Sequence, residues 1–275
     1  MSIAYITDAQ MLKKTRIERH PRLNFWRLST NINFSDFDIG DLLFFLSKDR
    51  EYLKKGEKGI IGFGRCAGFK VASPQHMWRV YKEENGYSSK EEFFSALKRS
   101  QKDRMLPERI SAIYLEDVLF LQMPIYLSEC GMNISPRTES YIYLDKEVPL
   151  KILKYAKDRL DFWSSHEDAD KVIEKEIRRI ILKQAAEDAG DLPLPANELQ
   201  LLQRRAKSFQ KQHPDYLFLD PQHTILFSID QKTEILFPKD RRIDRRFWLG
   251  QRALYQEKLD FEPEYRVYDK ECEEL

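Results

Sequence analysis

The stretch Gly40-Asp-Leu-Leu-Phe-Phe-Leu-Ser (40–47), followed by Gly59-Ile-Ile-Gly-Phe-Gly-Arg (59–65), decides the fold of the first half of the chain. Its opening Gly-Asp pair is typical of the entry to a strand, and the apolar residues after it alternate between two faces. Gly62 and Gly64 interrupt the second apolar run, which indicates a β-bulge or a backbone approach too close for a side chain. We therefore predict two strands joined by a turn rich in lysine and glycine.

The rest of the first half has the same mixed character. A helix is predicted at 88–100, because Ser88 or Ser89 can cap it and acids follow in its first turn. The other segments are short apolar runs separated by glycine, proline and aspartate, which predict β-strands. These runs lie at 23–28, 42–47, 59–63, 110–115, 118–123 and 140–144.

The sequence changes character near residue 148, which predicts two domains, 1–148 and 149–275. The second is richer in helical periodicity and contains a β hairpin with a turn at 220–223. Its predicted helices are 149–163, 168–189, 197–211 and 244–257, and its predicted strands are 216–219, 224–229 and 264–268.

Composition sets the class of protein. The chain has 275 residues, of which 42% are hydrophobic and 33% charged, with a formal net charge of +1. This composition supports packed cores and a well-solvated surface. No apolar run approaches the ~20 residues of a membrane span, and the three cysteines have no zinc-ligand spacing, so we expect a cytoplasmic protein without a membrane partner.

Motifs spread over residues 20–145 resemble the PUA-like superfamily, the small barrels that include the EVE, YTH and SRA domains. The likeness is closer to the reader half of HNH restriction endonucleases. The matching residues are Gly40-Asp41 with Phe44-Phe45, Ile60 to Gly64, Trp78, Asn85-Gly86 and Ser89 to Glu92. Phe63 stands where that family has a glycine, and no HNH nuclease follows in the second half.

The resemblance implies an N-terminal PUA-like β-barrel. Together with the helical periodicity of the second half, it leads us to expect an α+β protein with a helix-rich α/β C-terminal domain. It also implies binding of nucleic acid and favours DNA over RNA. The expected setting is recognition of modified DNA in restriction or phage defence. A non-enzymatic reader or adaptor that recruits a partner protein, an RNA-binding relative, and a homodimer all stay open.

Aromatic residues are the candidates for base recognition, because PUA-like readers hold an extruded base against aromatic faces, a stack worth about 1–3 kcal/mol. They are Trp26, Phe45 and Trp78, with Asn85 as an amide that could read a base edge. Each has a structural alternative: Trp26 suits a core, Trp78 a lid over it, and Asn85 a turn. Phe44 and Phe45 point to opposite faces of a strand, so at most one of them lines a given pocket.

Basic residues gather in the second half although the total charge is nearly neutral. Residues 239–252 contain a cluster of arginines, and binding to nucleic acid depends on where such charges lie. The candidate phosphate contacts are Arg241, Arg242, Arg245 and Arg246. The alternative is a solvated helix face.

The Pro-Asp pair at 214–215 and the Asp-Gln-Lys run at 230–232 resemble the PD-(D/E)xK nuclease core. Such chemistry needs two carboxylates that hold Mg²⁺ and a lysine that activates the attacking water. With a turn at 220–223, position 215 would lie opposite Ser228 and on the same face as residues 230 and 232.

Asp215, Asp230 and Lys232 are therefore the predicted catalytic set, with Asp215 and Asp230 as the Mg²⁺ ligands. Glu176, on the preceding helix, is the candidate for a further acid. Pro-Asp and Asp-x-Lys are also common at surface hairpins, so ordinary solvated residues are the alternative.

Overall fold

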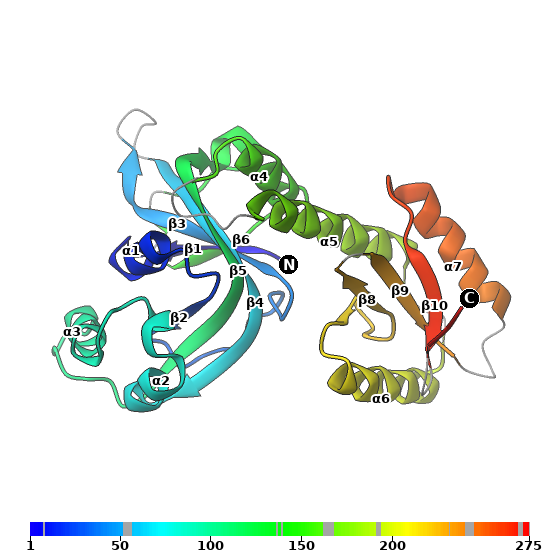
Figure 1. The fold of residues 1–275 in the computed structure, drawn as a ribbon, viewed down its shortest axis with the longest axis horizontal. Helices are drawn as coiled ribbons and strands as arrows, with labels where there is room; N and C mark the ends of the chain where they lie inside the picture. The colour runs from blue at the N-terminus through cyan, green and yellow to red at the C-terminus, as the bar shows by residue number, and fades with distance from the viewer. Residues whose placement is uncertain are drawn as a thin grey trace. The chain divides into compact units, whose positions relative to one another are not determined.

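The computed structural model of the chain describes residues 1–7, 9–51, 57–135, 137–138, 140–161, 168–190, 194–230, 232–239, 245–268 and 272–274. The chain divides into two compact units, Met1–Ile173 and Glu174–Leu275. Each unit has its own sheet and its own helices (Figure 1), which confirms the predicted α+β class. The change in sequence character near 148 lies upstream of this division, and the helix that follows it belongs to the first unit.

Unit 1 is built on one mixed sheet with the strand order β2-β5-β4-β3-β1-β6. Among the described residues no strand pairing joins β2 to β6, so the sheet does not close into the expected barrel. Its strands are β1 (Ile3–Thr7), β2 (Leu23–Arg27), β3 (Leu42–Glu51), β4 (Glu57–Ala72), β5 (Ile110–Tyr126) and β6 (Tyr141–Tyr143). Its helices are α1 (Ala9–Glu18), α2 (Pro74–Tyr81), η2 (Lys82–Asn85), α3 (Lys90–Ser100), η3 (Leu127–Cys130) and α4 (Val148–Lys157).

The two central strands are longer than predicted, and β5 joins the two runs that the sequence separated. Bulges make this length possible, because the β4–β5 pairing shifts register three times. One shift falls between Ile60 and Gly62, where a Cβ on Gly62 would lie 2.5 Å from the Leu119 carbonyl oxygen. The predicted close backbone approach at Gly62 is thus confirmed.

Helix α3 begins where the sequence predicted, since the Ser89 hydroxyl accepts a hydrogen bond from the Glu92 amide at 3.2 Å. Helices α1 and α2 were not predicted. Helix α2 begins with Pro74 after Ser73, whose hydroxyl accepts a hydrogen bond from the His76 amide. A serine cap followed by proline is a helix start signal.

The core of unit 1 lies against β3, β4 and β5, where aromatic rings stack in series. Phe45 has no exposed surface and stacks on Phe25 and Phe120, at 6.2 and 5.8 Å between ring centroids. Helix α4 packs on β5 and η3, and its Ile152, Leu153 and Ala156 are fully buried.

Unit 2 is built on a second sheet with the order β11-β10-β9-β8-β7, in which β9 and β10 are parallel and the other pairs antiparallel. Its strands are β7 (Leu217–Phe218), β8 (Leu226–Ile229), β9 (Thr233–Pro238), β10 (Glu264–Tyr268) and β11 (Cys272–Glu274), and its helices are α6 (Ala196–Gln212), α7 (Arg245–Lys258) and the greater part of α5 (Ala169–Ala189). Strand β9 was not predicted. The hydrophobic core includes Phe237, Trp248 and Tyr255. Over the described part of the chain, no helix combines the length and the apolar character needed to cross a membrane.

Candidate ligand-binding site

Unit 1 contains a hollow of about 650 Å³ beside the end of strand β2. We call it the β2 hollow. It is lined by the end of β1, the start of α1, residues 25–29, Tyr87 and the last turn of α3. Figure 1 shows these elements on the α1–α3 side of unit 1. Its described lining contains two arginines, Arg27 and Arg99, and no acid, so the walls carry positive charge.

Trp26 forms part of the wall of the β2 hollow and is one of the predicted site residues. Its ring packs against Phe93 at 6.0 Å and Tyr87 at 6.4 Å between centroids. The indole Nε1 is buried and has no hydrogen-bond partner among the described residues. A buried N–H without a partner costs about 1–3 kcal/mol. Because this atom has almost no accessible surface, a ligand acceptor would reach it only if the neighbouring side chains moved.

Arg27 follows Trp26 and also lines the β2 hollow. Only 8% of the residue is exposed. One guanidinium nitrogen donates to the carbonyl oxygen of Asn31, while Nε is buried without a partner. The guanidinium lies over the rings of Phe34 and Tyr5, at 4.9 and 5.6 Å from their centroids. No carboxylate of the described residues pairs with it.

A second hollow, of about 700 Å³, lies between α1 and α3 and shares Gln10, Tyr87 and Arg99 with the first. We call it the α1–α3 groove. Its charges are mixed, because Glu18, Glu91 and Glu92 line it together with Lys13 and Lys14.

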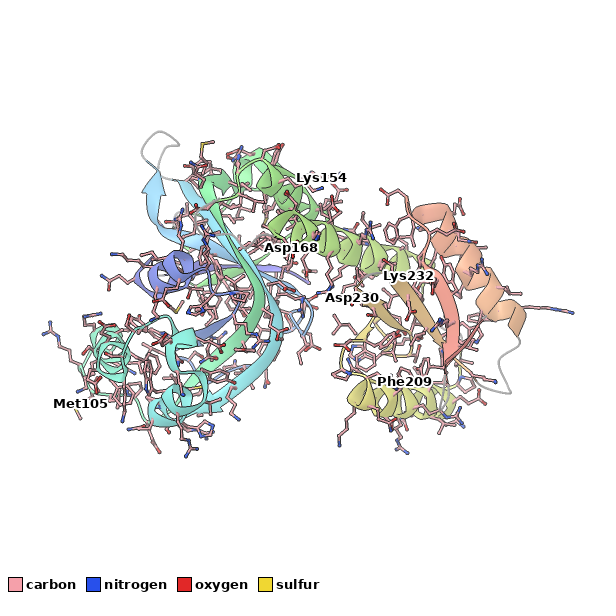
Figure 2. All side chains as sticks on the ribbon, in the orientation of Figure 1. Met105, Lys154, Asp168, Phe209, Asp230 and Lys232 are labelled. Carbon is pink, nitrogen blue, oxygen red and sulfur yellow. The ribbon has the colours of Figure 1, made fainter. Side chains whose placement is uncertain are left out.

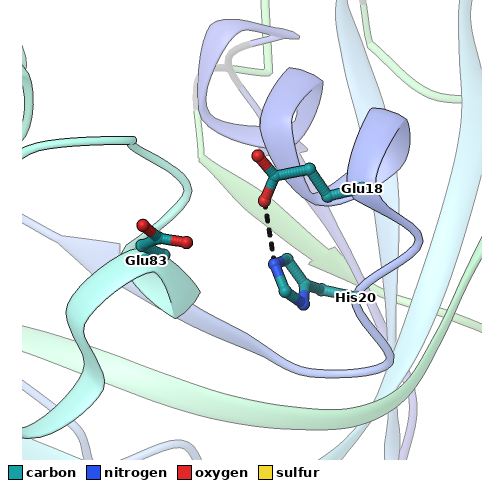
Figure 3. Close-up of side chains that lie close together, drawn as sticks. All are labelled: Glu18, His20 and Glu83. Atoms are coloured by element: carbon teal, nitrogen blue, oxygen red, sulfur yellow. Dashed lines mark hydrogen bonds and ion pairs between the residues drawn. The ribbon is translucent and has the colours of Figure 1, made fainter.

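The α1–α3 groove borders a cluster of Glu18, His20 and Glu83, the one group of three possible metal ligands found among the described residues (Figure 3). His20 lies 2.9 Å from Glu18, and the Lys14 ammonium pairs with Glu18 at 3.1 Å and with Glu83 at 3.2 Å. Burial lowers the pKa of Lys14, but the two carboxylates outweigh it and raise the pKa above its ordinary value. Because a lysine already neutralises these acids, we do not assign a metal to them.

Two predicted base-reading residues have structural roles instead. Phe45 is enclosed between two other rings and has no free face on which a base could stack. Asn85 is fully buried: its oxygen accepts from Asn24 at 2.9 Å, and its amide donates to the Lys82 carbonyl at 2.7 Å. This side chain joins η2 to β2, so its amide is not available to a base edge.

Trp78 lies on α2, partly buried, with its ring stacked on Phe93 at 6.1 Å. It packs against the small core formed by α2, α3 and the start of β5, as expected of a lid. It is absent from the lining of the β2 hollow and of the α1–α3 groove. Trp78 and Trp26 therefore share a core neighbour, Phe93, but of the two only Trp26 lines one of these two described hollows.

The predicted nuclease residues of unit 2 lie in turns beside short strands, except Glu176, which lies on helix α5. Figure 2 labels Asp230 and Lys232 at the turn between β8 and β9. Asp230 is exposed and pairs with Lys175 at 3.8 Å, whereas Lys232 pairs with Glu264 of β10. Glu176 is buried and pairs with Arg179 at 2.9 Å.

The register of the sheet explains why the predicted convergence does not occur. Leu217 pairs with Phe227, so position 215 would fall opposite Ile229 rather than Ser228. A shift of one residue moves every side chain to the other face of a strand. In addition, Asp215 lies in the turn before β7, outside the strand.

The arginine cluster lies mostly outside the described residues. Arg241 and Arg242 are not described, and Arg245 begins helix α7 without a described side chain. Arg246 is exposed on the same helix.

Sequence reasoning missed Arg27, Tyr87 and Arg99 as lining residues. Tyr87 carried a weak signal, because an aromatic residue directly after the Asn-Gly pair suits an exposed turn poorly. Nothing within a few residues of Arg27 indicates that it is buried without an acid. That property depends on the rings of Tyr5 and Phe34, which come from other segments.

No known family profile matches this chain, and no curated protein matches its sequence. Solved structures of an ASCH protein from Zymomonas mobilis are similar to part of it. The ASCH structure is 15% identical, has a TM-score of 0.38, and the match covers 56% of this chain and 94% of that one. Two mutants of the same protein match at 15% identity with TM-scores of 0.39 and 0.40, over 56% of this chain and 96% and 95% of theirs. We base no functional conclusion on this likeness.

Proposed function

We propose that unit 1 binds nucleic acid and holds one base in the β2 hollow, beside Trp26. The observation that carries the proposal is Trp26 itself, which lines a hollow large enough for a base and whose buried indole N–H has no partner among the described residues. Base edges offer acceptor oxygens and nitrogens that such a donor satisfies. The motifs that resemble PUA-like readers support the same class of function.

Charge in and around the hollow supports a polyanion as the ligand. Arg99, shared by the β2 hollow and the α1–α3 groove, is exposed, and no ion pair joins it to a described acid. Lys13, also exposed, lines the groove beside it. These two exposed cations are the candidate contacts for a phosphate backbone, although glutamates also line the groove.

DNA with a modified base is the ligand that the resemblance favours, in a restriction or phage-defence setting. We do not propose Mg²⁺-dependent cleavage by unit 2, because Asp215, Asp230, Lys232 and Glu176 are engaged separately or lie on different faces. A non-enzymatic nucleic-acid-binding protein, whose second unit recruits a partner protein, agrees better with this arrangement of the four residues.

The test is a titration of the full chain with fluorescently labelled oligonucleotides: single-stranded DNA, single-stranded RNA, and duplexes with and without modified cytosine. We expect binding that weakens linearly on a log–log plot as salt rises, because phosphate contacts release counterions. No binding to any of these probes at low salt would refute the proposal, and the order of affinities decides between DNA and RNA.

Arg99→Gln should reduce the slope of that salt dependence by about 1, because one phosphate contact is lost. Arg109→Gln is the matched control, since Arg109 is also an exposed arginine of unit 1 but lines neither hollow. The measurement is the oligonucleotide dissociation constant at several salt concentrations. Equal slopes for the two variants would remove Arg99 from the interface.

A further inference from the structure

The burial of Arg27 sets it apart from the other arginines at this surface. Only 8% of the residue is exposed, whereas Arg99, which also lines the β2 hollow, is open to solvent. Its guanidinium makes one hydrogen bond to the described residues, in which a terminal nitrogen donates to the carbonyl oxygen of Asn31. Its Nε–H is buried and unpaired. A guanidinium has five N–H donors, so most of its hydrogen-bonding capacity is unused.

A buried charge is costly unless an opposite charge and hydrogen bonds compensate it. The faces of Phe34 and Tyr5 attract the guanidinium and offset part of this cost. They accept none of its in-plane N–H groups. What Arg27 lacks is an anion in the plane of the guanidinium, and the described residues supply none.

We propose that Arg27 binds a phosphate group of the ligand in the β2 hollow. Arginine presents a planar fork of donors that matches a phosphate in a bidentate contact. The described lining of the hollow contains no carboxylate that would repel the phosphate, and Arg99 adds a second positive charge. The inference rests on the proposed function for its ligand, a nucleotide whose base lies beside Trp26 and whose phosphate lies at Arg27.

The competing account gives Arg27 a purely structural role. In that account, the contacts with Phe34, Tyr5 and Asn31 fasten the segment after β2, and the unpaired donor is a tolerated cost. The two accounts differ in what removal of the charge does to the free protein. Removal of an uncompensated buried charge leaves stability unchanged or raises it, whereas removal of a structural fastener lowers it.

The experiment is thermal unfolding of the full chain in sodium phosphate and in sodium chloride of equal ionic strength, for the natural protein, Arg27→Met and Arg27→Lys. We expect phosphate to raise the melting temperature of the natural protein above its value in chloride. Phosphate also stabilises folded proteins in general because it is excluded from their surface, so Arg27→Met should keep only that general part of the difference. In chloride, this variant should melt at the same temperature as the natural protein or above it. Arg27→Lys should keep a smaller difference, because a lysine retains the charge but not the fork.

Arg109→Met is the control, because it removes an exposed arginine of the same unit and should keep the full phosphate effect. The inference is overturned if the natural protein melts at the same temperature in both salts, or if Arg27→Met keeps a phosphate effect as large as that of the natural protein and of Arg109→Met. If Arg27→Met does not fold, Arg27→Lys decides: an undiminished phosphate effect in that variant overturns the inference.

Oligonucleotide titrations of the same variants separate this inference from the proposed function. At least tenfold weaker binding by Arg27→Met, with the salt slope reduced, supports a backbone phosphate at Arg27. Unchanged oligonucleotide binding by that variant overturns the phosphate contact and leaves the proposed function intact. A phosphate effect that needs Arg27, in a protein that binds no oligonucleotide, refutes the proposed function and supports a free phosphorylated ligand at the same site.

Discussion

Gly86→Ala will destabilise unit 1 by about 3 kcal/mol or more. Gly86 has a φ of +85°, which costs a residue with a side chain about 1–2 kcal/mol. A Cβ at this position would also lie 2.2 Å from the carbonyl oxygen of Met11 in helix α1. Backbone atoms cannot yield as a flexible side chain does, so α1 or η2 must move, and overpacking of this kind costs about 1–3 kcal/mol more.

Gly131→Ala is the matched control for this prediction. Gly131 has the same φ of +85° and also ends a short 3₁₀-helix, but a Cβ there would meet nothing within 4 Å. Its replacement should therefore cost only the backbone strain, about 1–2 kcal/mol. Urea unfolding of the two variants, followed by circular dichroism, gives the difference. Equal losses of stability would show that the approach of Gly86 to α1 carries no cost.

The second large effect is expected at Trp26, where Trp26→Phe should weaken oligonucleotide binding about tenfold. The substitution keeps an aromatic face for stacking and removes the indole N–H. A ligand acceptor left without that donor loses about 1–2 kcal/mol, which corresponds to a factor of about ten. The melting temperature of the free protein should change little, because the donor has no partner before the ligand binds.

Trp78→Phe is the control for Trp26→Phe. Both tryptophans pack against Phe93 and both are partly buried, but Trp78 does not line the β2 hollow. We expect its substitution to leave the dissociation constant within about twofold of the natural value. A larger loss in Trp78→Phe than in Trp26→Phe would move the site to the surface of α2.

The buried hydrogen bond between Asn24 and Asn85 links the β2 hollow to the stability of unit 1. Asn85 accepts a hydrogen bond from Asn24, two residues before Trp26 on β2, and Gly86 follows it at the approach to α1. Tyr87, next in the chain, packs against Trp26 in the wall of the hollow. The Asn-Gly pair therefore positions the wall, although neither residue is available to read a base.

Much of the secondary structure could be predicted because its causes are local. The helix at Ser89 follows from a hydroxyl and an amide three residues apart, and the glycine at 62 signals a close approach whatever strand lies opposite. Helix α2 was missed although its signal, a capping serine before Pro74, was present. The extra length of β4 and β5 could not be predicted, because it depends on bulges that only paired strands reveal.

The sequence by itself determined the α+β class, the elements whose caps and periodicity lie within a few residues, and the aromatic and basic residue types that a nucleic-acid site needs. Only the tertiary structure decided which of these residues form a site. Asn24 and Asn85 are 61 residues apart, and their hydrogen bond turns a candidate base reader into a structural amide. Arg27 became a candidate, and Trp26 stayed one, for the opposite reason: the described segments folded against them leave the Arg27 Nε and the Trp26 Nε1 without a partner. Whether a buried donor is satisfied depends on contacts between distant segments, and no local pattern in the chain records it.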